Sequence, residues 1–133
     1  MADFPALQHE FFDFELANKL PDRAPPRILI LYGSLRERSF SRFAAEEAGR
    51  LLTAMGASVQ TFNPSGLPLP DDAPESHPKV VELRERVRWC DGMIWSSPER
   101  HGAMSAVMLL GAAVVNQIVA QELLSDTGLP AVF

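Results

Sequence analysis

The sequence predicts an α/β protein with a doubly wound parallel sheet, and three observations support this. Residues 27–32, RILILY, form a short continuous apolar run, which is typical of a strand buried on both faces of a parallel sheet. Strand-like and helix-like segments then alternate along the chain, which favours right-handed crossover connections. The chain has 133 residues, 47% of them hydrophobic and 22% charged, as expected of one globular domain.

We expect an N-terminal arm over residues 1–26, followed by the domain over residues 27–133. The arm ends in Pro25-Pro26 and carries four aromatic rings among acidic residues: Phe4, Phe11, Phe12 and Phe14. It has room for one short helix, about Ala6–Lys19, whose rings must pack on their own domain or on a neighbouring subunit. Early acidic residues and the lack of a continuous apolar run argue against a signal peptide.

A first helix is expected from about Ser41 to Met55. Gly56 should end it, because glycine readily adopts the positive φ of a helix terminus. At helical spacing one face of this segment is apolar and predicted to pack on the sheet: Phe43, Ala44, Ala48, Leu51, Leu52 and Met55.

The remaining elements follow in order. The pattern predicts a strand at 58–62, a proline-rich loop at 63–78 and a helix at about 79–90, ending at Cys90. A strand at 92–96, a loop at 97–102 and a last helix at about 103–124 complete the series. The core residues expected from the middle helix are Val80, Val81, Leu83, Val87 and Cys90.

Charge and cysteine content narrow the class of function. The formal net charge of −5 argues against nucleic acid as a partner, because phosphate backbones are held by basic surfaces. The single cysteine, Cys90, excludes an intrachain disulfide and disfavours a thiolate metal site, so we expect a structural thiol. A cytoplasmic location is the corresponding expectation.

The segment after the first strand, Gly33 to Ser41, has the composition of a phosphate-binding loop. It offers three hydroxyls, from Ser34, Ser39 and Ser41, and two guanidinium groups, from Arg36 and Arg38. It also precedes a helix N-terminus, where backbone N–H groups and the helix dipole favour an anion. The segment is neither a G-x-G-x-x-G loop nor a Walker loop. The plain alternative is a strand-to-helix turn in which one serine caps the helix.

A second polar loop follows the strand at 92–96. Because the carboxyl ends of parallel strands meet at one edge of the sheet, we expect the two loops to be neighbours. Pro98 fixes the backbone, and Gly102 allows a planar ring to approach closely. Arg100 and His101 offer hydrogen-bond donors.

Three stretches, GSLRERSFS, FNPSGLPLPDDAPESHPKV and SPERHGAMS, resemble the ArsH family over about residues 1–108. These are arsenic-resistance flavoproteins among the NADPH-dependent FMN reductases, with a flavodoxin-like fold. The resemblance implies that the first loop holds the FMN phosphate and the second the isoalloxazine ring. The cofactor-binding residues predicted on this basis are Ser34, Arg36, Arg38, Ser39, Phe40, Ser41, Pro98, Glu99, Arg100, His101 and Gly102.

The resemblance further implies hydride transfer from NADPH to FMN, with electrons passed to oxygen, quinones, dyes, metal ions or organoarsenicals. It implies a cytoplasmic homo-oligomer, a dimer or tetramer, that acts on small molecules. Neither nucleic acid nor a membrane is expected as a partner. No side chain is assigned as a catalytic acid or base, and none as a metal ligand.

After about residue 108 the chain departs from the family pattern, so only about three strands of the sheet are expected. The strand at 92–96 would then form an apolar edge. The uncharged segment 103–121 could lie along that edge, join a subunit interface or, as a third possibility, span a membrane. The alternative to a reductase is a truncated, non-catalytic remnant. It would bind FMN or another phosphorylated ligand weakly, or only associate with other subunits.

Overall fold

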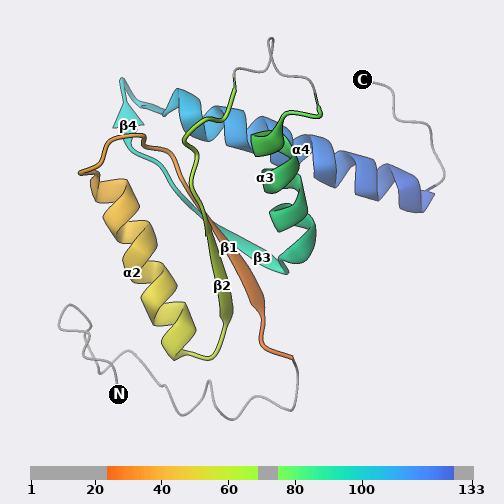
Figure 1. The fold of residues 1–133 in the computed structure, drawn as a ribbon, viewed down its shortest axis with the longest axis horizontal. Coiled ribbons are helices and arrows are strands. Elements are labelled where there is room, and N and C mark those ends of the chain that lie inside the picture. The colour runs from red at the N-terminus through yellow and green to blue at the C-terminus, as the bar shows by residue number, and fades with distance from the viewer. Residues whose placement is uncertain (1–23, 69–74, 128–133) are drawn as a thin grey trace.

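The computed structural model describes residues 24–68 and 75–127, and at residues 100, 117–119 and 121–127 it describes the backbone alone. The predicted arm, with its helix at about Ala6–Lys19, therefore lies outside the described residues except for its last three positions. The described parts form three layers, with a parallel sheet between one helix on one face and two helices on the other (Figure 1).

The sheet has β1 (Arg27–Tyr32) at its centre, flanked by β2 (Ser58–Phe62) and β3 (Gly92–Ser96). Both neighbours run parallel to β1, in the order β2-β1-β3. All three strands have the predicted bounds, and the α/β flavodoxin-like fold is confirmed. Parallel neighbours require crossover helices, and these cover the two faces of the sheet.

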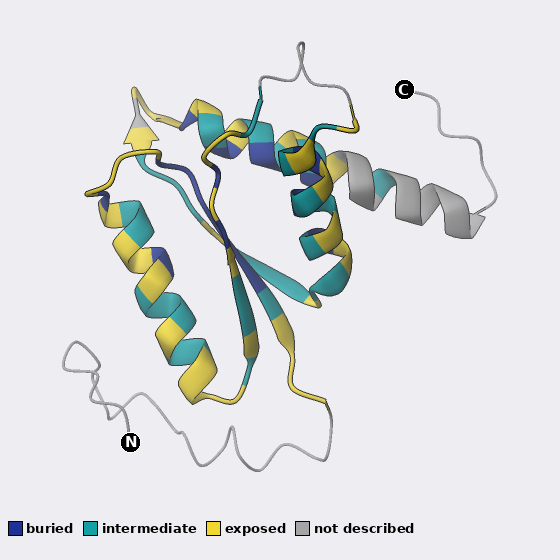
Figure 2. Ribbon diagram, viewed as in Figure 1, coloured by how far each residue is buried: buried dark blue, intermediate teal, exposed yellow. Residues whose placement is uncertain are grey.

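The side chains of β1 alternate between two hydrophobic clusters. Leu29 and Leu31 point toward α3 (Pro78–Trp89) and α4 (Ala106–Thr127), where they pack with Phe62, Leu83, Val87, Met108 and Val115. Ile30 and Tyr32 point to the opposite face, toward α2 (Phe40–Ala54). Figure 2 shows the buried stretch of β1 between these helices. The continuous apolar run of β1 thus reflects burial on both faces.

The predicted buried face of α2 is wrong by part of a turn. The side chain that α2 buries is Ala45, with Ala48 and Leu52 packed beside it, whereas Phe43 is 48% exposed and Met55 37%. The reason is close approach to the sheet. A Cβ on Gly49 would lie 3.4 Å from Ile30 Cδ1, so small residues face the sheet and larger ones flank it.

Both ends of α2 are capped. The Oγ of Ser39 accepts a hydrogen bond from the backbone N–H of Arg42, which makes Ser39 the N-cap. At the other end, Gly56 has a φ of 91° and Met55 is the C-cap. The N–H of Gly56 bonds the carbonyl of Thr53, and that of Ala57 bonds Leu52, as in a Schellman motif.

The predicted bounds of α3 are each displaced by one residue, since it starts at Pro78 and ends at Trp89. Proline suits the first helical position, because its missing N–H would have no partner there. His77 is the N-cap, and its Nδ1 accepts from the N–H of Lys79 at 3.2 Å. Val81, predicted in the core, is exposed.

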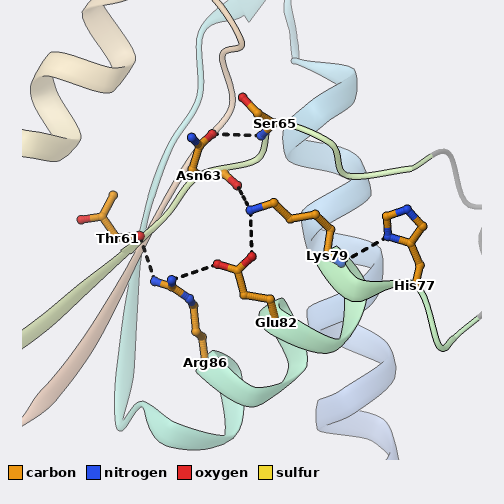
Figure 3. Close-up of polar contacts among 7 residues, drawn as sticks. All are labelled: Thr61, Asn63, Ser65, His77, Lys79, Glu82 and Arg86. Carbon is orange, nitrogen blue, oxygen red and sulfur yellow. Dashed lines mark hydrogen bonds and ion pairs between the residues drawn. The ribbon is translucent and has the colours of Figure 1, made fainter.

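A polar network fastens the carboxyl end of the edge strand β2 to α3 (Figure 3). Lys79 Nζ donates to the carbonyl of Asn63 at 3.0 Å and to Glu82 at 2.8 Å. Arg86 donates to the carbonyl of Thr61 at 2.9 Å and pairs with Glu82. The ammonium of Lys79, foremost, and the nearby guanidinium of Arg86 lower the pKa of Glu82. The network covers backbone acceptors that an edge strand would otherwise expose.

An ion pair joins β1 and β3 at their amino ends. Arg27 donates from its backbone N, its Nε and its terminal nitrogen to the carboxylate of Asp91, at 2.9, 3.1 and 2.7 Å. These hydrogen bonds lower the pKa of Asp91 to about 2. The pair fixes the start of β3 at the end of the sheet remote from both predicted loops.

The last helix begins three residues later than predicted, at Ala106 rather than Ala103, and continues to Thr127. Its described side chains pack against α3 and β1. Within residues 24–68 and 75–127, no helix has the length and apolar character needed to cross a membrane.

Candidate functional site

A pocket of about 680 Å³ opens where β1 and β3 reach their carboxyl ends. It is lined by Ser34, Arg36, Arg38, Ser39, Phe40, Ser41, Ser96, Ser97, Pro98, Glu99 and His101. Nine of the eleven residues predicted from the sequence are in this lining. Figure 1 shows the physical reason, since the segment before α2 and the segment after β3 lie side by side at one edge of the sheet.

The first loop turns sharply off β1 and runs into α2. Ser34 is buried, and its Oγ accepts from the backbone N–H of Arg36 at 3.2 Å. The hydroxyls of Ser39 and Ser41 lie 2.8 Å apart. Ser39 is thus the helix cap, as the plain alternative required, but capping occupies only one of the three loop serines. The other two hydroxyls serve no helix cap.

The electrostatics of the first loop favour an anion. The first turn of α2 carries no acidic residue, so no carboxylate of its own competes for the positive end of the helix. Arg36 and Arg38 are exposed, and neither guanidinium makes a hydrogen bond or ion pair within the described part of the chain. Two uncommitted guanidinium groups beside a helix N-terminus can supply charge-assisted hydrogen bonds to a bound phosphate.

Phe40 is the most exposed large apolar residue of the described chain, at 92%. It is the first residue of α2 and lines the pocket beside the arginines. An aromatic ring in this position offers an apolar face to a ligand or to another subunit.

The second loop is a short hairpin, which the sequence did not predict. β4 (Glu99–Arg100) pairs antiparallel with β5 (Ala103–Met104). The two residues between them, His101 and Gly102, have φ values of 53° and 75°. Two consecutive residues with positive φ form the type I′ turn that joins two-residue hairpins, and this reversal delays the start of α4.

The hairpin places the predicted ring-contacting residues differently. Pro98, Glu99 and His101 line the pocket. Arg100 lies in β4 opposite Ala103, and its side chain is outside the described part. Gly102 occupies the turn rather than the pocket wall, and nothing lies within 4 Å of the place a Cβ would take. Its requirement for glycine is therefore conformational.

Serine hydroxyls join the two loops to each other. The Oγ of Ser96 donates to the carbonyl of Ser41 at 2.8 Å, and the Oγ of Ser105 donates to the carbonyl of Gly33 at 2.6 Å. The Oγ of Ser97 accepts from the N–H of Ser105 at 3.1 Å. None of these three serines was predicted as a site residue. Only Ser105 carries a local signal, because a serine just before an apolar helix predicts an N-cap.

Cys90 lies away from this site. It is the C-cap of α3, where its Sγ donates to the carbonyl of Val87 at 3.2 Å, and it packs against the cluster around Leu83. Burial raises the pKa of the thiol. A protonated, half-buried thiol at the amino end of β3 agrees with a structural role.

Comparison with known proteins places these features in one family. Residues 26–110 match the family described as NADPH-dependent FMN reductase. The chain is 61% identical over 99 residues to the NADPH-dependent FMN reductase ArsH of Rhizobium meliloti, covering 68% of this chain and 41% of that protein. It is 64% identical over 83 residues to the protein of the same name from Acidithiobacillus ferrooxidans, covering 62% and 35%. For that of Shigella flexneri the identity is 52% over 106 residues, covering 78% and 42%.

The resemblance to ArsH proteins found in the sequence is confirmed by these comparisons. The chain spans between 35% and 42% of the length of these three curated relatives. The matched region contains both loops of the pocket and all three strands of the sheet.

Proposed function

This chain belongs to the NADPH-dependent FMN reductase family, and we propose that its pocket binds FMN and that the protein passes a hydride from NADPH to that flavin. One observation carries the proposal. The pocket at the carboxyl ends of β1 and β3 combines a phosphate-type donor set on one side with an open hairpin on the other. Its volume of about 680 Å³ is in the range of pockets that hold small molecules and cofactors.

The first loop would hold the phosphate. Ser34, Ser39 and Ser41 would donate hydroxyl hydrogen bonds, and Arg36 and Arg38 would supply positive charge. The N-terminus of α2 adds backbone N–H groups that have no partner inside the helix. The exposed ring of Phe40 would shield the apolar part of the ligand from water.

The hairpin would hold the ring. Pro98 contributes no N–H and keeps the backbone rigid, while Glu99, Arg100 and His101 would face the polar edge of the flavin. Donors from Arg100 and His101 would stabilise negative charge there. When bound, FMN supplies the redox chemistry, and the protein orients it and tunes its electrostatic surroundings. No side chain of the chain is needed as a nucleophile.

The electron acceptors, the oligomeric state and the location of the protein are part of the same proposal. We propose oxygen, quinones, dyes, metal ions or organoarsenicals as electron acceptors, on the resemblance to ArsH proteins. We also propose a dimer or tetramer, supported by exposed apolar residues in the two loops and in the first turns of α2 and α4: Leu35, Phe40, Phe43, Met104 and Leu109. A cytoplasmic location is proposed from the single cysteine.

The first experiment records the absorbance spectrum of the purified protein with and without added FMN, and then adds NADPH without oxygen. We expect flavin bands that bleach with NADPH. Flavin that binds without bleaching would favour the non-catalytic alternative. A folded protein that binds no FMN would refute the proposal, and competition by other phosphorylated compounds would then identify a different ligand.

Riboflavin and charge variants make this experiment specific for the phosphate. Several charge-assisted hydrogen bonds should favour FMN over riboflavin by at least roughly 100-fold. Arg36→Ala and Arg38→Ala should weaken FMN binding and leave riboflavin binding unchanged. Arg50→Ala is the matched control, because it removes the same charge from the surface of α2, where Arg50 pairs with Glu47 outside the pocket. Equal losses in all three variants would show a general charge effect.

A further inference from the structure

Ser105 connects parts of the chain that lie far apart in the sequence. Only 6% of it is exposed, and it is not among the residues that line the pocket. Its Oγ donates to the carbonyl of Gly33, 72 residues away, at 2.6 Å. The same oxygen accepts from the N–H of Met108 at 3.2 Å and lies 3.5 Å from the Oγ of Ser97. One hydroxyl therefore contacts the end of β1, the start of α4 and the root of the hairpin.

Gly33 leaves no room for a side chain beside Ser105. A Cβ at this position would lie 2.5 Å from the Oγ of Ser105, 3.0 Å from the Cβ of Met108 and 3.2 Å from the Oγ of Ser97. Its φ is not positive, so no unusual backbone conformation explains the glycine. What requires it is the close approach of Ser105, because any side chain would separate the two loops.

Helix capping alone does not account for Ser105. An N-cap needs only an acceptor, and the bond from the N–H of Met108 satisfies that need. The hydroxyl proton is directed instead to the carbonyl of Gly33, across the boundary between the two loops. The N–H of Gly33 also bonds the carbonyl of Ser96, the last residue of β3, at 2.9 Å, so both backbone groups of Gly33 are bonded to residues that flank the hairpin.

We propose that Ser105 is a positioning residue, which through Gly33 sets the distance between the phosphate-binding loop and the hairpin. This inference rests on the proposed function, since the distance matters only to a ligand that reaches both loops. FMN would do so, with its phosphate at the first loop and its ring at the hairpin. Inorganic phosphate would contact the first loop alone, and riboflavin the hairpin.

The inference predicts an unequal effect on these ligands. Ser105→Ala removes the donor to the Gly33 carbonyl and leaves that buried acceptor unpaired. We expect the FMN affinity to fall roughly tenfold, the worth of one such hydrogen bond. The affinity for inorganic phosphate, measured by competition with FMN, should stay within about twofold of the unmodified protein. Ser105→Thr keeps the hydroxyl and should restore FMN binding.

The experiment titrates FMN fluorescence quenching in the unmodified protein, Ser105→Ala, Ser105→Thr and Gly33→Ala, with circular dichroism to check folding. Gly33→Ala provides an independent route, because its Cβ should push Ser105 away and reproduce the loss of FMN with phosphate retained. The inference is overturned if Ser105→Ala and Gly33→Ala bind FMN like the unmodified protein, or lose affinity for FMN and for inorganic phosphate in parallel. If the unmodified protein does not bind FMN, the proposed function itself is refuted.

Discussion

The turn at His101 gives the sharpest test of the hairpin, because its backbone and its imidazole can be altered separately. His101 has a φ of 53° and precedes Gly102, whose φ is 75°. Histidine and asparagine occur in this left-handed region several-fold more often than other non-glycine residues, whereas a β-branched residue there is strained. His101→Asn should therefore keep the turn while removing the ring, and His101→Val should keep neither.

The expected magnitude follows from that conformation. The left-handed conformation costs an ordinary residue about 1–2 kcal/mol, whereas asparagine adopts it readily. We therefore expect valine at position 101 to destabilise the turn by at least this amount relative to asparagine. Since about 1.4 kcal/mol is a factor of ten, the ratio of folded to unfolded hairpin should fall roughly 5- to 30-fold in His101→Val. His101→Gly should relieve the strain in the turn, but glycine also makes the unfolded hairpin more flexible. These effects oppose each other, so we expect the stability of the hairpin to match that in His101→Asn within about 1 kcal/mol.

The assay is the FMN affinity of each variant, followed by the rate of flavin bleaching after saturation with FMN. The valine variant should bind FMN roughly tenfold more weakly than the asparagine variant. If the imidazole also stabilises the reduced ring, the asparagine and glycine variants should bind FMN normally but bleach more slowly. Equal FMN affinity in the valine and asparagine variants would refute the reasoning, because it would show that the ligand does not depend on the turn.

Three further predictions concern the core, the sheet and the helix cap. Leu83→Ala should lower the free energy of unfolding in urea by about 2–5 kcal/mol, because Leu83 is fully buried in α3. Val81→Ala should lower it by under about 1 kcal/mol, because Val81 is exposed on the same helix. Because the folded pKa of Asp91 is lowered from 3.8 to about 2, its pairing with Arg27 stabilises the fold fully above pH 4 and is lost as the pH falls toward 2. Thermal melts should show that Asp91→Asn removes this part of the acid dependence, and an unchanged slope would contradict the pairing. Ser39→Ala should lower the free energy of unfolding by about 1 kcal/mol through loss of the helix cap. Ser39→Asp should keep the cap, but its carboxylate should repel the phosphate of FMN. FMN binding by the aspartate variant would exclude a phosphate site at this loop.

The sequence by itself determined the layered architecture and most of the residues that line the pocket. The strands at 27–32, 58–62 and 92–96 could be predicted because apolar runs bounded by proline and glycine are local signals. Parallel strands then bring their carboxyl ends together, so two polar loops far apart in the chain had to be neighbours. Nothing more than chain order was needed for that step.

Only the tertiary structure decided which face of α2 is buried, how the second loop folds and what joins the loops. Phe43 is more apolar than Ala45, yet Ala45 is inside, because the sheet lies too close for a ring. The hairpin at His101 and the bond from Ser105 to Gly33 depend on backbone angles and on a contact across 72 residues. A sequence pattern reports the chemistry of each residue, whereas these features depend on which distant atoms share the space around it.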